Sequence, residues 1–286
     1  MPKLLTFRES FAMVESSVQE GRSGIIVLLM GTQGYGKGEF SSLIRKKLSG
    51  KGFSVMQYRA VSGAERNPYS IFESMFSQVG ESHHFQDKGE ILKRLEKYLA
   101  SHSSGTLIVV ENVHNLLNES LDVLIDAVPI VRKYRAVLTG TTIIVDETNL
   151  DLKMLINHLV EKTGTELVQL KEPDFTDLQL IANENGFFIP DGLLKDLFAM
   201  TRGSISLFKN AIIYYQKVGI IDSDGRINES VSRFLPIPPS QDVFYESVIG
   251  QLSSRQRFIL DTLTVLGGYA SLNSWLSEGT TGLNPD

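Results

Sequence analysis

The chain has 286 residues, no cysteine and a formal net charge of −5 at pH 7. The lack of cysteine excludes disulfides, thiolate metal sites and a cysteine nucleophile, and a hydrophobic content of 42% excludes a disordered chain. The acidic balance gives no global attraction to nucleic acid, although a local basic face stays compatible with it. The longest apolar stretch near the start is shorter than the roughly 20 residues of a membrane span, so we expect a cytoplasmic protein without membrane contact.

The first part of the chain alternates helical and strand patterns. Residues 3–21 place apolar side chains at helical spacing, and this spacing predicts a helix before the first strand. Short, continuously apolar runs, typical of parallel strands buried on both faces, occupy 25–30 and 106–112. The other predicted strands are 53–60, 135–144 and 165–171, and the predicted helices are 39–52, 68–80, 88–102, 120–134 and 151–164.

This alternation predicts an α/β fold with a parallel sheet, helices on both faces and the ligand at the carboxyl ends of the strands. After residue 172 the pattern is helical, and residues 223–240 carry the turn and proline signals of a linker or short hairpin. Helical periodicity returns at 241–276. We therefore expect a P-loop nucleotide-binding domain at 1–172, a helical lid at 173–222, and a linker with a winged-helix-like segment at 223–286.

A glycine-rich loop follows the first buried strand. Gly31, Gly36 and Lys37 satisfy the pattern G-x-x-x-x-G-K, in which loop N–H groups and the following helix surround phosphate oxygens and lysine neutralises them. The alternative is an ordinary glycine turn with a solvated lysine. The position between strand and helix favours nucleotide binding, with contacts predicted from Gly31, Thr32, Gln33, Gly34, Tyr35, Gly36, Lys37, Gly38 and Glu39.

The residue after the lysine is unusual for a phosphate-binding loop. A serine or threonine hydroxyl normally ligates Mg²⁺ here, whereas this chain has Gly38, followed by the carboxylate of Glu39. Glycine offers no ligand, and a carboxylate repels phosphates unless it points away or holds the metal itself. Ser41 and Ser42 lie further along the helix, too far to substitute. We expect weakened affinity for Mg²⁺.

The strand at 106–112 ends in Glu111 and Asn112. In P-loop ATPases the first of these positions holds Mg²⁺ and the second polarises the attacking water. Glu111 is therefore the predicted metal-binding residue and a catalytic candidate. Asn112 stands at the catalytic position, where an amide cannot act as a base. The alternative is a core strand that simply ends in polar residues.

Two further segments are candidates for contact with the nucleotide. Thr139 and Thr141 lie at the end of a predicted strand, where a hydroxyl could sense the γ-phosphate, although threonine is also an ordinary strand residue. Arg202 lies in the helical region and could contact a phosphate or be a solvated helix-end arginine. No ligand-spaced metal set includes the five histidines, which are His83, His84, His102, His114 and His158.

Taken together, these motifs resemble the STAND branch of the AAA+ superfamily, the signal-transduction ATPases. The likeness covers nearly the whole chain and is carried by FRES, GTQGYGKG, RAVSGAERNPYSIFESM, VVENVHNL, TRGSISLF and FLPIPPSQDVFYESVIGQLSSRQRFILDTLTVLGG. It implies a nucleotide-binding sheet, a helical lid, a winged helix and a sensor region. The family's glycine, asparagine and proline run in the lid is here Gly203, Ser204 and Ile205, a third departure beside Gly38 and Asn112.

Three functions are compatible with this sequence. The leading hypothesis is an ATP- or ADP-binding regulatory switch with slow or absent hydrolysis, weak use of Mg²⁺ and a protein partner or self-association. The second is an active ATPase of the origin-recognition initiator kind that binds DNA through its winged helix. The third is a nucleotide-free scaffold whose exposed helices bind a partner protein.

Overall fold

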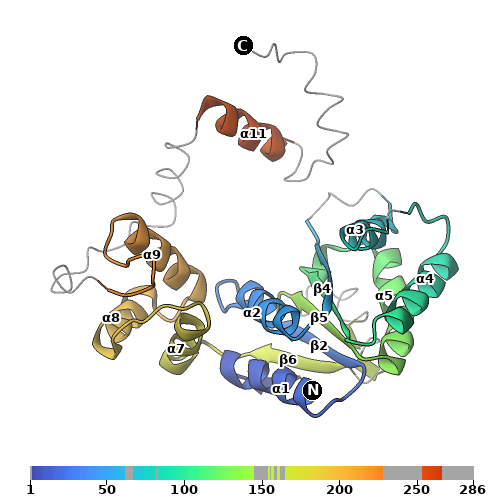
Figure 1. Cartoon of the computed structure of the whole chain (residues 1–286), viewed down its shortest axis with the longest axis horizontal. Coiled ribbons are helices and arrows are strands. Elements are labelled where there is room, and N and C mark those ends of the chain that lie inside the picture. Colours follow the sequence, from blue (N-terminus) through green and yellow to red (C-terminus); the bar gives the residue numbers. More distant parts are fainter. Residues whose placement is uncertain are drawn as a thin grey trace.

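The computed structural model describes residues 2–61, 67–81, 83–144, 165–227 and 253–265, with a few single positions between 154 and 161. Within this part of the chain six parallel strands form one sheet in the order β1-β6-β2-β5-β4-β3 (Figure 1). The strands are β1 (Lys3–Leu5), β2 (Ile25–Met30), β3 (Ser54–Arg59), β4 (Thr106–Glu111), β5 (Ala136–Thr142) and β6 (Glu166–Leu170).

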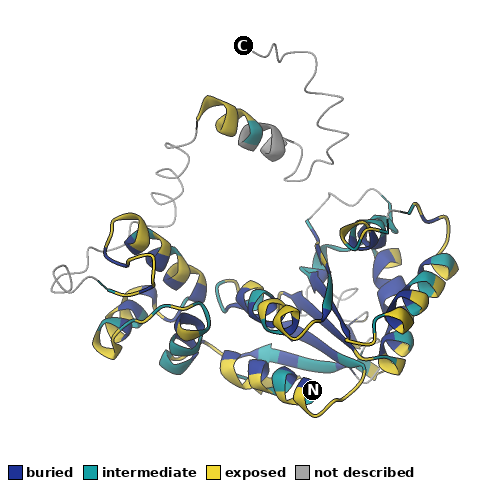
Figure 2. Ribbon diagram, in the orientation of Figure 1, coloured by how far each residue is buried: buried dark blue, intermediate teal, exposed yellow. Residues whose placement is uncertain are grey.

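Helices cover both faces of this sheet. On one face α3, α4 and α5 pack against side chains such as Ile26 and Leu28, and on the other α1 and α2 pack against Val27 and Leu29. Alternate residues of a strand point to opposite faces, which explains the uninterrupted apolar run of β2. The dark strands at the centre of Figure 2 show this double burial. The helices are α1 (Phe7–Gln19), α2 (Lys37–Gly50), α3 (Ser70–Gln78), α4 (Lys88–Ser101) and α5 (Asn118–Lys133).

The predicted parallel sheet with helices on both faces is confirmed, with one correction at the start of the chain. The helix expected over residues 3–21 spans only Phe7–Gln19, because Lys3–Leu5 form β1 beside β6. Thr6 separates the two elements: its hydroxyl accepts a hydrogen bond from the N–H of Glu9, and the Glu9 carboxylate accepts one from the N–H of Thr6. This capping box fixes the helix start. The predicted helix 151–164 lies mostly outside the described residues.

A second group of helices follows the sheet. These are α7 (Phe175–Glu184), α8 (Asp191–Thr201) and α9 (Ile205–Lys217), and we call them the lid. Their apolar faces join the same core as α1 and α2. Asp177, fully buried on α7, accepts a hydrogen bond of 2.8 Å from the main-chain N–H of Arg8 on α1, and burial raises the pKa of this carboxyl. The lid is thus tied directly to the sheet layer.

The end of the chain is described only in part. A turn closed by a bridge between Ile221 and Ile227 begins the predicted linker or hairpin, and α11 (Ser254–Val265) lies in the stretch predicted to be helical. The remainder of 228–286, including most of the predicted winged-helix segment, lies outside the described residues. Within the described helices, none combines the length and apolar character that crossing a membrane requires.

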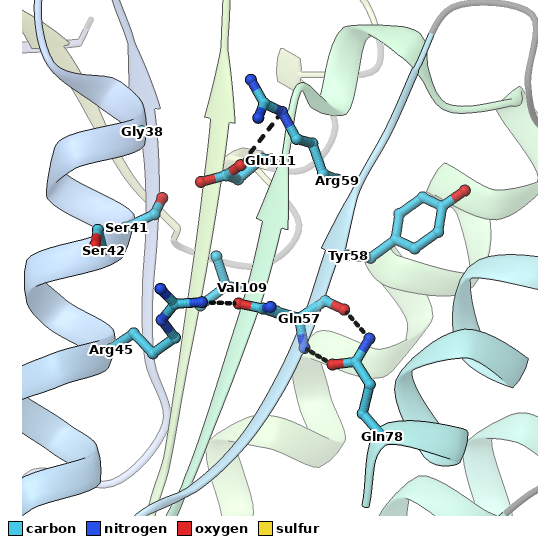
Figure 3. A pocket seen from close by; sticks show the side chains of 10 residues that line it. All are labelled: Gly38, Ser41, Ser42, Arg45, Gln57, Tyr58, Arg59, Gln78, Val109 and Glu111. Carbon is cyan, nitrogen blue, oxygen red and sulfur yellow. Dashed lines mark hydrogen bonds and ion pairs between the residues drawn. The ribbon is translucent and has the colours of Figure 1, made fainter. Parts of the chain in front are cut away.

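Strand β3 forms one edge of the sheet, and a side chain covers part of it. The amide of Gln78, at the end of α3, accepts a hydrogen bond from the N–H of Gln57 at 3.1 Å and donates one to its carbonyl at 2.7 Å (Figure 3). Gln57 also accepts a hydrogen bond from Arg45 on α2, at 2.7 Å. The outward peptide groups of Gln57 are therefore satisfied by a side chain that acts like a neighbouring strand.

Candidate functional site

The phosphate-binding loop connects β2 to α2 as the sequence predicts. Gly34 and Gly36 have φ of +89° and +91°, in the left-handed region that glycine adopts without strain. Gly36 is the N-cap of α2 and supplies no capping side chain. The first N–H groups of an α-helix have no partner within the helix, so the start of α2 presents donors and the positive end of the helix dipole to the loop.

Lys37 is the first residue of α2, and its side chain reaches back to this loop. Its ammonium group donates hydrogen bonds to the main-chain carbonyls of Gly31, at 2.6 Å, and Thr32, at 3.0 Å. Burial lowers the pKa of Lys37 below its ordinary value. This ammonium group has no buried carboxylate partner. An anionic ligand could therefore bind it more strongly than the two neutral carbonyls do, because hydrogen bonds between charged groups are stronger.

The first residues of α9 in the lid contact the loop directly. The N–H of Ile205 donates a hydrogen bond of 2.9 Å to the carbonyl of Gly34. A Cβ added to Gly34 would stand 2.9 Å from the hydroxyl oxygen of Ser204, and one added to Gly36 would stand 2.5 Å from Cδ1 of Ile205. The loop therefore needs glycine at both positions for two reasons, its backbone conformation and the closeness of the lid.

Glu39 does not face the phosphate loop, although the sequence suggests a nucleotide or metal contact. Its side chain is almost fully buried and forms an ion pair with Lys209 of α9. Its second carboxylate oxygen accepts a hydrogen bond of 2.9 Å from the amide of Asn185, the residue that ends α7. Glu39 thus joins the first turn of α2 to two elements of the lid.

A cavity of about 690 Å³ opens between the loop, the carboxyl ends of the strands and the lid. This is the place where parallel α/β sheets bind ligands. The residues that line it include Gln33, Gly34, Gly36, Lys37, Gly38 and Glu39, then Arg59, Glu111, Asn112, His114, Asn115 and Thr141, and on the lid Ile205, Ser206, Lys209, Asn210 and Ile213. The predicted loop residues Gly31, Thr32 and Tyr35 stand in the loop beside this cavity without lining it.

Glu111 and Asn112 both line this cavity, but the side chain of Asn112 makes a structural hydrogen bond. Its φ of +58° is left-handed, a conformation that asparagine tolerates better than most residues. The Asn112 N–H donates to the hydroxyl of Thr141 at 3.1 Å, and its side-chain amide donates to the carbonyl of Ala60 at 3.2 Å. The side chain therefore ties the end of β4 to the end of β3 and has no basic group to activate water.

Thr139 is not brought to the cavity. It lies in the middle of β5, paired with Val27 and Val109, and its side chain is fully buried with no hydrogen-bond partner for its hydroxyl among the described residues. Thr141 lies two residues further along the same face and does line the cavity. The structure therefore brings Thr141, at the carboxyl end of the strand, to the cavity and leaves Thr139 in the core.

Arg202 also lies away from the cavity. It ends α8 in a left-handed conformation with φ of +50°, and its side chain is exposed. The lid residues that line the cavity come instead from the following helix, α9, and among them Lys209 carries the positive charge. The solvated helix-end alternative therefore describes Arg202 better than a phosphate contact.

Arg59 and His114 are among the lining residues that were not predicted as site residues. Arg59 ends β3, opposite Glu111 in the register of β3 and β4, and its Nε lies 3.6 Å from Oε2 of Glu111. His114 lies in the short turn η1 (Val113–Asn115), with Nδ1 3.4 Å from the hydroxyl of Thr142. Burial first, and then the charge of Lys37, lower the pKa of His114. The position of Arg59 depends on strand register, which the sequence alone does not specify.

The donors in this cavity do not suit a divalent metal. Gly38 supplies no ligand, Glu111 is paired with Arg59, and Glu39 is paired with Lys209. The hydroxyl of Ser41 donates to the carbonyl of Lys37, at 3.3 Å. In the part of the chain that the structure describes, no three histidine, aspartate or glutamate side chains gather as a metal site would require. Weak magnesium affinity stays a prediction.

Comparisons with known proteins agree with the fold. Residues 20–148 match the model of the AAA domain family. The ORC1 protein of Aeropyrum pernix, solved in complex with DNA, is 17% identical with a TM-score of 0.51, and the alignment covers 100% of this chain and 81% of that one. Cdc6p of Pyrobaculum aerophilum is 13% identical, with a TM-score of 0.51 over 93% of this chain and 77% of that one.

A STAND protein with a tetratricopeptide repeat sensor, from Pyrococcus horikoshii, is 15% identical, with a TM-score of 0.46 over 88% of this chain and 34% of that one. No curated protein matches the sequence significantly. The STAND assignment therefore stays a prediction. Residues 20–148 are thus similar to the AAA domain family, and the parallel sheet with its flanking helices has the P-loop NTPase fold.

Proposed function

We propose that this protein is a regulatory switch that binds ATP or ADP, hydrolyses ATP slowly or not at all, and reports the bound nucleotide through the position of its lid. The groups that bind a polyphosphate in P-loop proteins are all present: the glycine loop, the start of α2 and Lys37. We assign the polyphosphate to the cavity of about 690 Å³ that these groups line together with α9.

The observation that carries this proposal is the contact between loop and lid. Ile205 donates its N–H to the carbonyl of Gly34, and its side chain leaves no space at Gly36 even for a methyl group. A phosphate that settles into the loop redirects Lys37 and reorganises this contact, because the packing leaves no slack to absorb the change. Glu39 adds a second link from α2 to the lid. Occupancy of the loop and orientation of the lid are therefore coupled.

The chemistry of the site supports binding more than turnover. Asn112 stands at the position of the water-activating residue and uses its side-chain amide to bind the carbonyl of Ala60. General-base or water-positioning groups contribute typically about 10²–10⁴ in rate. The loop and Lys37 can bind phosphate without any general base, and both are present in this chain. We expect a long-lived nucleotide complex.

Isothermal titration of the purified chain with ATP and with ADP tests the binding step. We expect saturable binding of both, weakened about 10- to 100-fold in Lys37→Ala, the effect of one hydrogen bond to a charged group. Hydrogen exchange of residues 205–217 should then change when nucleotide is added to wild type and not when it is added to Lys37→Ala. No binding by wild type at roughly millimolar nucleotide would reject the proposal.

An active ATPase that binds DNA is the second candidate, because the similar ORC1 protein was solved in complex with DNA. It predicts measurable ATP turnover that Lys37→Ala abolishes and duplex binding that weakens steeply with salt. The switch predicts turnover near background. A scaffold that does not use nucleotide predicts the same melting temperature with and without ATP, whereas a switch is stabilised by its ligand.

A further inference from the structure

One ion pair in the cavity stands where a P-loop ATPase needs a free carboxylate. Glu111 ends β4 at the position that holds Mg²⁺, and its side chain is 22% exposed. Arg59 lies opposite it on β3, with Nε 3.6 Å from the Glu111 carboxylate (Figure 3). Both residues line the nucleotide cavity together with Lys37 and Gly38.

The main chain fixes this pairing. The N–H of Ala60, the residue after Arg59, donates a hydrogen bond of 2.9 Å to the carbonyl of Glu111. The side-chain amide of Asn112 donates to the carbonyl of Ala60 from the other side. The end of β3 is therefore held against the end of β4, and the Arg59 side chain starts beside Glu111.

The first turn of α2 leaves open space at Gly38. A Cβ added there would meet no atom within 4 Å. A second cavity, of about 340 Å³, continues from here between α2 and β3, and Arg59 and Glu111 line it as well. The long Arg59 side chain, 71% exposed, has room to turn toward a phosphate in the main cavity.

We propose that Arg59 takes the place of the divalent cation, so that this chain binds the nucleotide polyphosphate without Mg²⁺. A guanidinium carries a permanent charge and five N–H donors, which lets it contact a carboxylate and a phosphate together. Among the charged side chains described around the cavity, Lys209 is paired with the buried Glu39, whereas the partner of Arg59 is the partly exposed Glu111. Lys37 donates only to main-chain carbonyls, so we assign Lys37 and Arg59 to the phosphates. The inference rests on the proposed function, because it names how the same site neutralises its ligand.

The test measures ATP affinity of the full chain by titration in two buffers, one with Mg²⁺ and one with EDTA. Wild type should bind ATP equally in both, within about twofold. Arg59→Ala and Arg59→Gln should lose about tenfold in EDTA, the effect of one hydrogen bond to a charged group. Arg45→Ala is the matched control: it removes an exposed arginine that hydrogen-bonds Gln57 in the smaller cavity, and its affinity should equal that of wild type.

A fourth variant restores the metal ligand. In Gly38→Thr/Arg59→Ala, a hydroxyl faces a Glu111 carboxylate that is no longer paired, so ATP binding should become stronger in Mg²⁺ than in EDTA by about tenfold. Loss of wild-type binding in EDTA, or unchanged binding by both Arg59 variants, would overturn the inference while leaving nucleotide binding established. Failure of wild type to bind ATP in either buffer would reject the proposed function and this inference with it.

Discussion

The two sides of the proposed nucleotide cavity differ in the chemical groups that line them. On the loop side, Gly34, Gly36 and Lys37 form a phosphate-binding loop, and α9 of the lid packs against it. On the strand side, the carboxylate of Glu111 is paired with Arg59, and the side-chain amide of Asn112 donates to the carbonyl of Ala60. The loop side therefore presents groups suited to binding a phosphate, whereas the strand side presents an ion pair and an amide.

The physical reason is that the two sides have different requirements. A phosphate-binding loop needs a backbone conformation and a helix start, which are part of the fold itself. Hydrolysis needs particular side chains at strand ends, and replacing them leaves the core intact. The strand side also accepts residues with structural uses, as Asn112 shows by joining β4 to β3.

The largest expected effect concerns the loop side. Gly36→Ala combines a φ of +91° with a Cβ 2.5 Å from Ile205, so we expect a loss of about 2–4 kcal/mol in the free energy of unfolding, measured by urea denaturation. Gly38→Ala is the matched change two residues later, in a helix and in open space. It should stabilise the protein by about 0.5–1 kcal/mol. If Gly36→Ala and Gly38→Ala destabilised the protein equally, the loop would not require glycine at position 36.

The next effect concerns the link to the lid. Lys209→Ala leaves the buried carboxylate of Glu39 with Asn185 as its remaining partner, and we expect a loss of about 1–3 kcal/mol in the free energy of unfolding. Adding Glu39→Gln removes the unpaired charge and should recover part of this loss. Lys133→Ala breaks an exposed pair with Glu96 and should change stability by less than about 0.5 kcal/mol. If Lys209→Ala matched Lys133→Ala, Glu39 would not be a structural link.

The smallest effect is a change in titration. Burial and the charge of Lys37 lower the pKa of His114, so its contribution to stability is present above the ordinary value of 6.5 and is lost as the pH falls through the lowered pKa. A bound polyphosphate should raise that pKa, which proton NMR of the His114 ring can follow. His102 stacks on Tyr98 near the opposite ends of the strands and serves as the unchanged control. If ATP left the titration of His114 unaltered, the bound nucleotide would not lie near the strand side of the cavity.

Much of the fold could be predicted from the sequence because each element carries a strong local pattern. The buried strands are short apolar runs, and the glycine loop stands between a strand and a helix. The three-residue strand β1 was missed because Leu4 and Leu5 continue the apolar spacing of the helix that follows. Only its pairing with β6, more than 160 residues later, reveals a strand.

The site residues show the same limit. Thr139 and Thr141 lie on the same face of β5. Thr139 is in the middle of the strand and belongs to the core, whereas Thr141 is near its end and lines the cavity. Arg202 ends α8 in a left-handed backbone conformation, which could not be predicted from the sequence. Arg59 and Lys209 enter the site through strand register and helix packing, which are tertiary relations between distant segments.

The side chain of Gln78 has a consequence for assembly. By engaging both outward peptide groups of Gln57, it occupies two of the hydrogen-bonding positions that another polypeptide would use to extend the sheet beyond β3. A strand from a second molecule would have to break two intramolecular hydrogen bonds before forming its own. Pairing of another strand with β3 is therefore disfavoured at Gln57.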